Sequence, residues 1–178
     1  MTEEELKKLW LIDENDNAIY TPVNPVEKFD EVPALADRMF SIMKQTDGAG
    51  LSANQIGVDA AMFVMRWPAI EGEQAGEFVV VNPKILKSSK ETTVYEEGCL
   101  SFPGLYIHLT RPETVEVEFQ NKEGQTENHT LKGWTSRIFQ HEYDHMLGIT
   151  FRQRVSRLKL DRADKKRARL ITELVNRR

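Results

Sequence analysis

Apolar residues recur along this chain with two different periods, and each period predicts a different element. Between Glu31 and Gln45 they are spaced three or four residues apart, as on one face of a helix, and Gly48 follows where such a helix would end. Between Thr114 and Gln120 valine and phenylalanine alternate with glutamate, which is typical of a strand with one buried face. We therefore expect an α+β fold.

Shorter segments add strands and turns to this pattern. Apolar runs at residues 61–65 and 78–81 are interpreted as strands, and the polar, glycine-bearing stretch 68–76 as the loop between them. Residues 121–124 have the composition of a turn, so 125–131 is expected to return as the hairpin partner of the preceding strand. No repeat or linker divides the chain, and we expect one domain over residues 1–178.

A second helical stripe contains two histidines. Its members are spaced four, three and four residues apart: Trp134, Ile138, His141 and His145. Gly148 lies just past the last of them, where a glycine in the left-handed conformation commonly ends a helix. We expect the stripe to point from a helix toward the interior.

The two histidines belong to the run His-Glu-Tyr-Asp-His at residues 141–145, which has the spacing of a metal site with its own general base. Residues four apart lie one turn above each other on a helix, so His141 and His145 can bind one divalent ion. Glu142 lies beside them and can take the proton of a water that the ion activates.

Two histidines do not complete a metal site. One extended protease pattern would require a histidine where this chain has Phe151, which cannot bind metal. Another protease class takes a later glutamate, and the only one after His145 is Glu173, among basic residues. Upstream lies the only cysteine, Cys99, which is either a small buried apolar residue or the third ligand.

Composition narrows the class of protein. Forty per cent hydrophobic and 29 per cent charged residues are ordinary globular usage over 178 residues. One cysteine excludes an internal disulfide, which favours a reducing compartment. The acidic start lacks the pattern of a signal peptide, and no apolar run approaches the roughly 20 residues of a membrane span. We expect a cytoplasmic protein without membrane attachment.

Three sequence blocks together resemble the peptide deformylase family. They are Gly-Ala-Gly-Leu-Ser-Ala-Asn-Gln at 48–55, Glu-Gly-Cys-Leu-Ser at 97–101 and Gln-His-Glu-Tyr-Asp-His at 140–145, and the resemblance extends from about Phe29 to Phe151. Two positions depart from the family pattern. Ser52 replaces a frequent alanine, and Tyr106 stands near a point where some members have a substrate-binding arginine.

The resemblance implies a fold, a reaction and a set of ligands. Mixed or antiparallel sheets would pack around the central histidine helix, with an N-terminal helix and a basic C-terminal helix. The reaction would remove the formyl group from the N-terminal formylmethionine of new polypeptides. The ligands would be Cys99, His141 and His145, with Glu142 as general base and acid.

The resemblance also implies oxyanion donors and a substrate pocket. The donors would be the side-chain amide of Gln55 and the backbone N–H of Leu100. The residues that would line or approach the substrate are Gly48, Ala49, Gly50, Tyr95, Glu97, Gly98, Trp134 and Ile138. Taken alone, Trp134 and Ile138 would be interpreted as core, and Gln55 as a residue that caps local backbone.

Metal preference and resemblance point to different ions. One cysteine and two histidines with an open position are typical of Zn²⁺. The resemblance implies Fe²⁺ as the native ion, with Ni²⁺, Co²⁺ or Zn²⁺ as substitutes.

Two other functions share parts of this pattern. A metallopeptidase that cleaves peptide bonds would need only the His-Glu-x-x-His run. A structural metal site would need four protein ligands, and the spare histidines, His108 and His129, are not spaced to supply the fourth.

Charge is concentrated at the C-terminal end. Residues 152–178 form a predicted basic helix with eleven Lys or Arg and three Asp or Glu, whereas the whole chain has a net charge of −4. Its apolar stripe is partial, so part of it should pack on the body. The helix is either a solvated face or a contact with ribosomal RNA. In the second case, removal of residues from about Arg162 should spare activity on short formylated peptides. No exposed apolar helix face is obvious in the sequence, so we expect a monomer.

Overall fold

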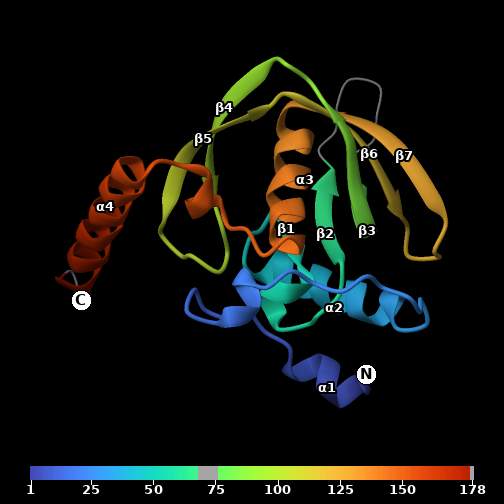
Figure 1. Ribbon diagram of the computed structural model, residues 1–178. Coiled ribbons are helices and arrows are strands. Elements are labelled where there is room, and N and C mark those ends of the chain that lie inside the picture. Colours follow the sequence, from blue (N-terminus) through green and yellow to red (C-terminus); the bar gives the residue numbers. More distant parts are fainter. Residues whose placement is uncertain (68–75, 177–178) are drawn as a thin grey trace.

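The computed structural model describes residues 1–67 and 76–176 and arranges them as antiparallel sheets around one central helix (Figure 1). Its helices are α1 (Glu3–Lys8), α2 (Val32–Gln45), α3 (Gly133–Met146) and α4 (Arg157–Asn176), with short 3-10 helices η1 (Asn17–Tyr20), η2 (Ala53–Ile56) and η3 (Phe151–Arg154). Its strands are β1 (Gly50–Ser52), β2 (Met62–Trp67), β3 (Gly76–Ser88), β4 (Thr92–Gly98), β5 (Tyr106–Pro112), β6 (Thr114–Gln120) and β7 (Thr126–Lys132).

Two sheets enclose α3. The larger has the strand order β1-β2-β3-β6-β7, and β4 pairs with β5 in a separate hairpin; every pairing is antiparallel. Ile138 and Phe139 of α3 pack on apolar residues of β2, β3 and β6, while α2 packs on β1 and β2 in a second cluster. The central helix is thereby held by the larger sheet on one side and the hairpin on the other (Figure 1).

Several sequence predictions are confirmed. The α+β class is correct, and the helix expected at residues 31–45 is α2. The alternating strand is β6 with the predicted bounds, and its hairpin partner is β7, one residue later than expected.

The strand expected at 78–81 is longer than predicted, because β3 continues to Ser88. Asn82 has a φ of 49°, and the register with β6 shifts between Val81 and Lys84. A left-handed asparagine before Pro83 resembles a strand end in sequence, but here it marks a bulge. Most of the predicted loop, residues 68–75, lies outside the described residues, and Gly76 already belongs to β3.

The prediction that the whole stripe on α3 points inward is wrong for its first residue, Trp134. Ile138, His141 and His145 are buried, whereas Trp134 is 44% exposed. Trp134 lies in the first turn of α3, where its ring meets Tyr95 edge-on at 5.6 Å. The stripe therefore runs from the surface into the interior.

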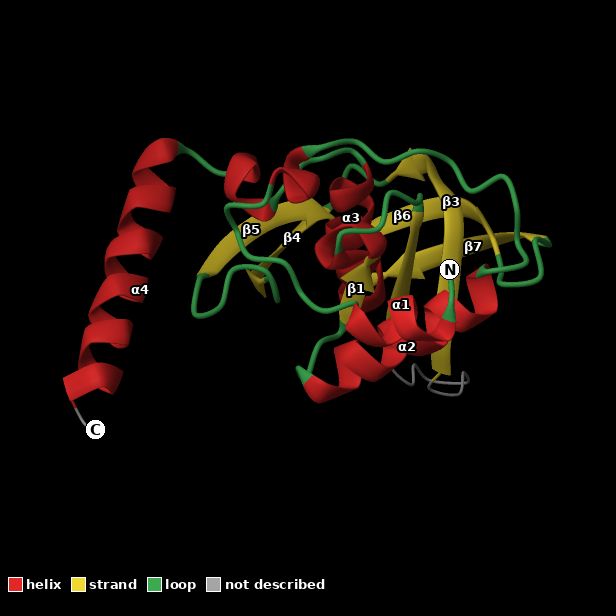
Figure 2. Ribbon diagram, turned by 90° about the horizontal axis from the view of Figure 1, so that it is seen from below, coloured by secondary structure: helices red, strands yellow, loops and turns green. Residues whose placement is uncertain are grey.

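The C-terminal helix α4 stands away from the body in both views (Figures 1 and 2). Leu160 and Ala163 pack against the cluster that includes Phe102 and Phe151, which is the partial docking that the sequence predicted. However, four apolar side chains of α4 are between 42% and 66% exposed: Leu158, Leu170, Ile171 and Val175. The basis for expecting a monomer, the absence of an exposed apolar helix face, is thus wrong for α4, and the oligomeric state stays a prediction.

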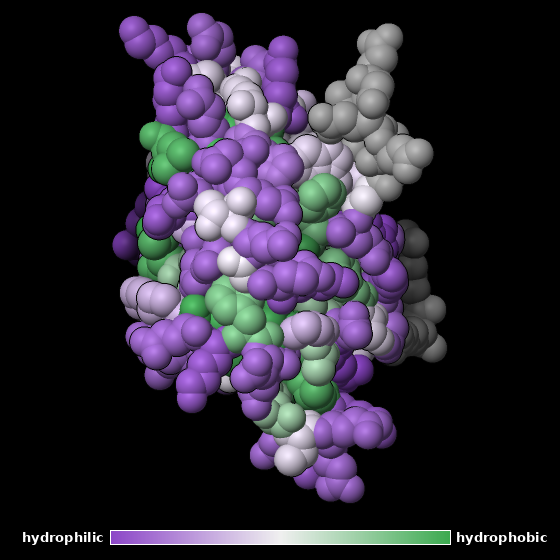
Figure 3. Space-filling view, turned by 90° about the vertical axis from the view of Figure 1, so that its right-hand side faces the viewer, coloured by the Kyte–Doolittle hydropathy of each residue, from purple (hydrophilic) through white to green (hydrophobic). Residues whose placement is uncertain are grey.

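The face shown in Figure 3 is mostly hydrophilic, with its apolar side chains scattered among charged ones. Among the helices in residues 1–67 and 76–176, none has the length and apolar character needed to cross a membrane.

The C-terminal end of α3 is fixed by backbone contacts. Gly148 has a φ of 67°, as predicted for the residue that ends this helix, and Val23 N donates to Met146 O at 3.1 Å. A Cβ on Gly148 would lie 2.6 Å from the carbonyl oxygen of Tyr20. Only glycine allows residues 20–22 to run this close to the helix end.

Gly148→Ala should lower the free energy of unfolding by about 3 kcal/mol, because it combines a left-handed backbone with a backbone clash. Gly124→Ala is the matched control, since Gly124 also has a positive φ, of 82°, but its Cβ would meet only the Phe29 ring at an ordinary 3.5 Å. It should cost about 1 kcal/mol. Urea denaturation of both variants checks the difference, and equal losses would contradict the close approach.

Candidate metal centre and substrate cleft

Cys99 and the two histidines of α3 come together at the bottom of a cleft. Their ligand atoms all lie within 4.8 Å of one another, and Cys99 Sγ is 3.4 Å from His145 Nε2. Cys99 follows β4, so the hairpin supplies one donor and the central helix supplies two. Cys99, the upstream candidate for the third ligand, is thus the one that lies with the two histidines, while Phe151 packs against His141 as a buried side chain.

The donor set fits a divalent metal ion. A cysteine sulfur and two imidazole nitrogens would hold such an ion and leave one position for solvent or substrate. His141 Nδ1 lies 2.9 Å from Glu97 Oε2, which leaves its Nε2 for an ion. Such a carboxylate partner commonly fixes the orientation of a metal-binding histidine.

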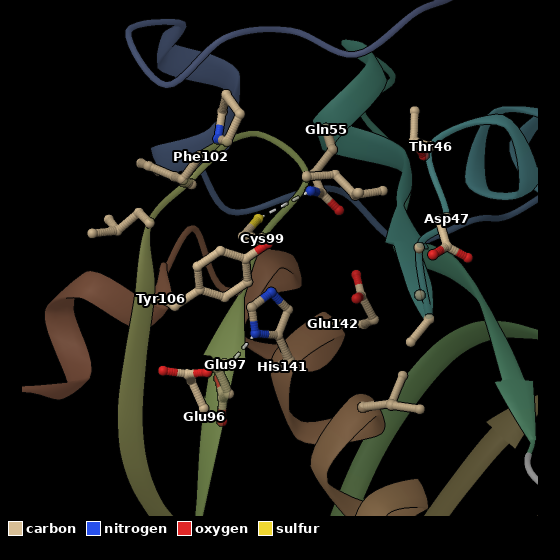
Figure 4. A pocket seen from close by; sticks show the side chains of 18 of the residues that line it. Thr46, Asp47, Gln55, Glu96, Glu97, Cys99, Phe102, Tyr106, His141 and Glu142 are labelled. Carbon is tan, nitrogen blue, oxygen red and sulfur yellow. Dashed lines mark hydrogen bonds and ion pairs between the residues drawn. The ribbon is translucent and has the colours of Figure 1, made fainter. Parts of the chain in front are cut away.

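Glu142 lies beside the three donors and is 4% exposed (Figure 4). Its Oε2 has no hydrogen-bond partner among the described residues. Burial raises the pKa of Glu142 to about 7, because desolvation penalises the charged carboxylate. A buried carboxylate with a free oxygen and a pKa near neutrality is suited to accept and return a proton.

Gln55 is held rigidly over Cys99. Its Oε1 accepts hydrogen bonds from Ser52 N at 3.0 Å and from Ser52 Oγ at 3.1 Å. Its Nε2 points to Cys99 Sγ at 3.2 Å (Figure 4). The same nitrogen also lies 3.2 Å from Ser101 Oγ. Both ends of the amide are therefore fixed, and its donor is aimed at the metal centre. The local capping interpretation is confirmed, since Gln55 completes a capping box with Ser52, and the oxyanion role of Gln55 stays a prediction.

Glu97 is the centre of a buried ion cluster. It accepts hydrogen bonds from Arg111 at 2.7 and 2.9 Å and from Arg137 at 2.8 Å, in addition to its contact with His141. Burial alone would raise the pKa of Glu97, but hydrogen bonds from His141 and Arg111, together with their charges, hold it well below its usual range. Glu97 is thus an anion at neutral pH.

The cluster continues along α3 to Asp144. Arg111 Nη1 donates to Asp144 Oδ2 at 2.6 Å, and Arg154 pairs with the same carboxylate. One arginine therefore bridges the carboxylate that orients His141 and a carboxylate on the histidine helix.

A cavity of about 910 Å³ opens above the metal centre. Its wall includes most of the residues predicted to contact substrate: Gly48, Ala49, Gly50, Glu97, Gly98, Trp134 and Ile138. Leu100, Gln55, Cys99, His141 and Glu142 also line it. Tyr95 does not. It packs behind Trp134 and under the Arg137 guanidinium, so it supports the wall and does not form it.

Gly50 and Gly98 show why glycine is needed on the two sides of the cavity. A Cβ on Gly50 would lie 2.5 Å from Glu142 Oε1, and one on Gly98 would lie 2.7 Å from the Tyr106 ring. Tyr106, the departure from the family pattern, lines the cavity and is 57% exposed. Its ring packs closely on Gly98.

Sequence reasoning missed Arg111, Arg137 and Asp144. A signal was present for Arg111, because β5 alternates Ile107, Leu109 and Arg111 on its buried face. An arginine at an inward strand position requires a buried acidic partner. Arg137 gave no comparable signal, since it lies on α3 and its partner, Glu97, lies on β4, 40 residues earlier in the chain.

Comparison with known proteins agrees with this geometry. A family model described as polypeptide deformylase matches residues 8–161. The chain belongs to the polypeptide deformylase family. The match extends beyond the region of sequence resemblance at both ends, into α1 and α4.

Individual relatives differ in how much of their length is matched. The chain is 46% identical over 127 residues to the chloroplastic peptide deformylase 1B of Oryza sativa subsp. japonica. The matched region covers 71% of this chain and 47% of that protein. The chain is 38% identical over 142 residues to the peptide deformylase of Thermotoga maritima, covering 79% and 83% of the two chains. The chain thus spans about half the length of the plant relatives it matches. A plant peptide deformylase crystal structure superimposes with a TM-score of 0.83 at 36% identity, covering 96% of this chain and 92% of the other.

Glu97→Gln should weaken metal binding by about 10- to 100-fold, because it removes the charge that orients His141 and leaves two buried arginines without a full partner. Competition with a chromophoric chelator measures the dissociation constant without reference to activity. Glu96→Gln is the control, since Glu96 is the adjacent residue on β4 and its side chain is 45% exposed. Equal affinities of the two variants would contradict the orienting role.

Proposed function

We propose that this chain hydrolyses the formyl group of N-terminal formylmethionine on newly made polypeptides, releasing formate and a free methionine amine. The observation that carries the proposal is the cleft in which a cysteine, two histidines, a buried glutamate and a fixed glutamine amide converge. Membership of the polypeptide deformylase family supports it.

A divalent ion bound by Cys99, His141 and His145 would lower the pKa of a water from about 16 to about 7 and polarise the formyl carbonyl. Glu142 then serves as the proton carrier, first accepting the proton of the water and later delivering it to the departing amine nitrogen. Its raised pKa allows it to hold that proton during the reaction.

The carbonyl oxygen gains negative charge as the formyl carbon is attacked. The Gln55 amide is the donor best placed to stabilise it, because Ser52 already fixes the amide and no reorganisation is needed. The backbone N–H of Leu100, next to Cys99 in the cavity wall, is the second proposed donor.

Substrate selection follows from the shape of the cavity wall. Ile138 is 5% exposed and lines the cavity beside Ala49 and Trp134, so an apolar methionine side chain has a matching surface there. Gly50 allows β1 to pass directly against Glu142, so little space remains near the reacting centre. Formyl is the smallest acyl group, and this restriction favours it.

A formyl-Met-Ala-Ser peptide tests the proposal. Release of formate with intact peptide bonds is expected, whereas the alternative metallopeptidase would cut the chain and release no formate.

Glu142→Ala should lower kcat by roughly 100- to 10,000-fold while the metal content stays the same, because the carboxylate carries a proton and is not a ligand. Cys99→Ala is the contrasting variant and should lose metal together with turnover. Steady-state rates on the formyl peptide, with metal analysis of the same samples, check both. Near-normal kcat in Glu142→Ala would contradict the mechanism.

We also propose Fe²⁺ as the native ion, on the basis of the family resemblance. Protein purified without oxygen should then contain iron and lose activity in air, and replacement by Ni²⁺ or Co²⁺ should preserve it. Metal analysis paired with turnover measures this. Full activity of a homogeneous zinc form, with an inert iron form, would contradict the proposal.

Ribosome contact through α4, in the cytoplasm, is a further part of the proposed function. Lys159, Arg162 and Lys166 are exposed and spaced three and four residues apart, so they share one helix face. Replacing all three with Gln should weaken co-sedimentation with ribosomes and reduce its salt dependence, because fewer phosphate contacts are made. Unchanged binding across a salt series would leave this face merely solvated.

A further inference from the structure

One wall of the cleft is a short turn that continues from the metal ligand Cys99. Phe102 N donates to Cys99 O at 2.9 Å, and Leu105 N donates to Phe102 O at 3.1 Å. Residues 102–105 all line the cavity. The position of this turn therefore sets the width of the cleft next to Cys99 and Leu100.

The outer side of the turn contacts the C-terminal helix. Arg167 of α4 donates from Nε to Pro103 O at 2.9 Å. Its Cγ also lies 3.8 Å from the place where a Cβ on Gly104 would sit. The Arg167 side chain is only 16% exposed, although most of α4 is solvated.

Arg167 is itself fixed by a group of alternating charges, which we call the rear cluster: Glu14, Arg152, Asp164 and Arg167. Arg167 Nη1 lies 2.9 Å from both carboxylate oxygens of Glu14. Arg152 approaches Glu14 at 3.5 Å and Asp164 at 3.3 Å. The cluster joins the N-terminal segment, η3 and α4, and it contains two positive and two negative charges.

The rear cluster touches the cleft wall at a second point. The Arg152 guanidinium carbon lies 5.6 Å from the centre of the Phe102 ring, while the same group also contacts Glu14 and Asp164 of the cluster. Partly exposed ion pairs contribute little stability by themselves, so their usual role would be to anchor α4. Here, however, they hold two arginines against the turn that forms the cleft wall.

We propose that α4 is a structural part of the substrate cleft and that Arg167 positions the 102–105 wall for the residues that follow formylmethionine. This inference rests on the proposed function. Arg167 touches neither the substrate nor the metal donors, so it is a positioning residue. The expectation from charge alone, that removal of residues from about Arg162 spares activity, changes accordingly, because that removal also deletes Asp164 and Arg167.

Arg167→Gln tests the proposal against Arg169→Gln. Arg169 is exposed and lies two residues further on the same helix, and its side chain makes no hydrogen bond or ion pair within residues 1–67 and 76–176; both variants lose the same charge from α4. On a formyl-Met-Ala-Ser peptide, Arg167→Gln should raise KM about three- to tenfold, the effect of one lost hydrogen bond, with kcat changed less than twofold. On formylmethionine amide, which ends before the wall, KM should change much less. Arg169→Gln should behave as the wild-type protein on both substrates.

Amide hydrogen exchange gives a readout that does not depend on turnover. Exchange in a peptide that covers residues 100–106 should be faster in Arg167→Gln than in the wild-type protein and unchanged in Arg169→Gln. Arg167→Lys keeps the charge beside Glu14 but has fewer donors, so it should restore part of the KM loss.

Three results would overturn the proposal: wild-type KM values in Arg167→Gln, equal losses on both substrates, or unchanged exchange at residues 100–106. If the wild-type protein releases no formate from either peptide, the proposed function fails, and the exchange measurement still decides whether α4 holds the wall.

Discussion

The buried carboxylate of Glu97 is the interaction on which the site depends. It joins β4 to β5 through Arg111 and to α3 through Arg137 and His141, so one side chain links the hairpin and the central helix. Removing these charges from water is costly, and only a complete set of partners compensates for it. Docking of the hairpin therefore orients His141 and brings Glu97 to Arg137, and without that docking Arg137 of α3 would lack its anion. Fold and metal centre form together for this reason.

The features that could be predicted from the sequence are those determined by residues close to one another in the chain. The histidines share a face because residues four apart always do so on a helix, and Gly148 ends that helix because only glycine accepts a positive φ against the Tyr20 carbonyl. The strand β6 shows its buried face directly in its alternation. The proposed ligand role of Cys99, by contrast, comes from resemblance, since nothing in its own sequence neighbourhood distinguishes a metal-binding cysteine from a buried one.

The features that the sequence analysis missed depend on contacts between residues that lie far apart in the chain. Trp134 looks like core by spacing, yet it lies in the first turn of α3 and is exposed. Arg137 follows three positions later, and its anion, Glu97, is 40 residues away. No periodicity reports such a partner. The continuation of β3 past Asn82 was missed for the opposite reason, because a local signal for a turn was overridden by pairing with β6.

The two ends of the chain illustrate how the distant contacts shape the cleft. Glu14 precedes the first sheet and Arg167 follows the last, yet their ion pair lies behind the turn that carries on from Cys99. Ile12 N also donates to Gln55 O at 2.9 Å, so the same N-terminal segment supports the glutamine on the other side of the metal centre. Both walls beside Cys99 are thus backed by one segment, residues 12–14. In the sequence, the basic residues after Arg152 indicate a basic tail. In the folded protein, one of them, Arg167, contacts the wall of the site.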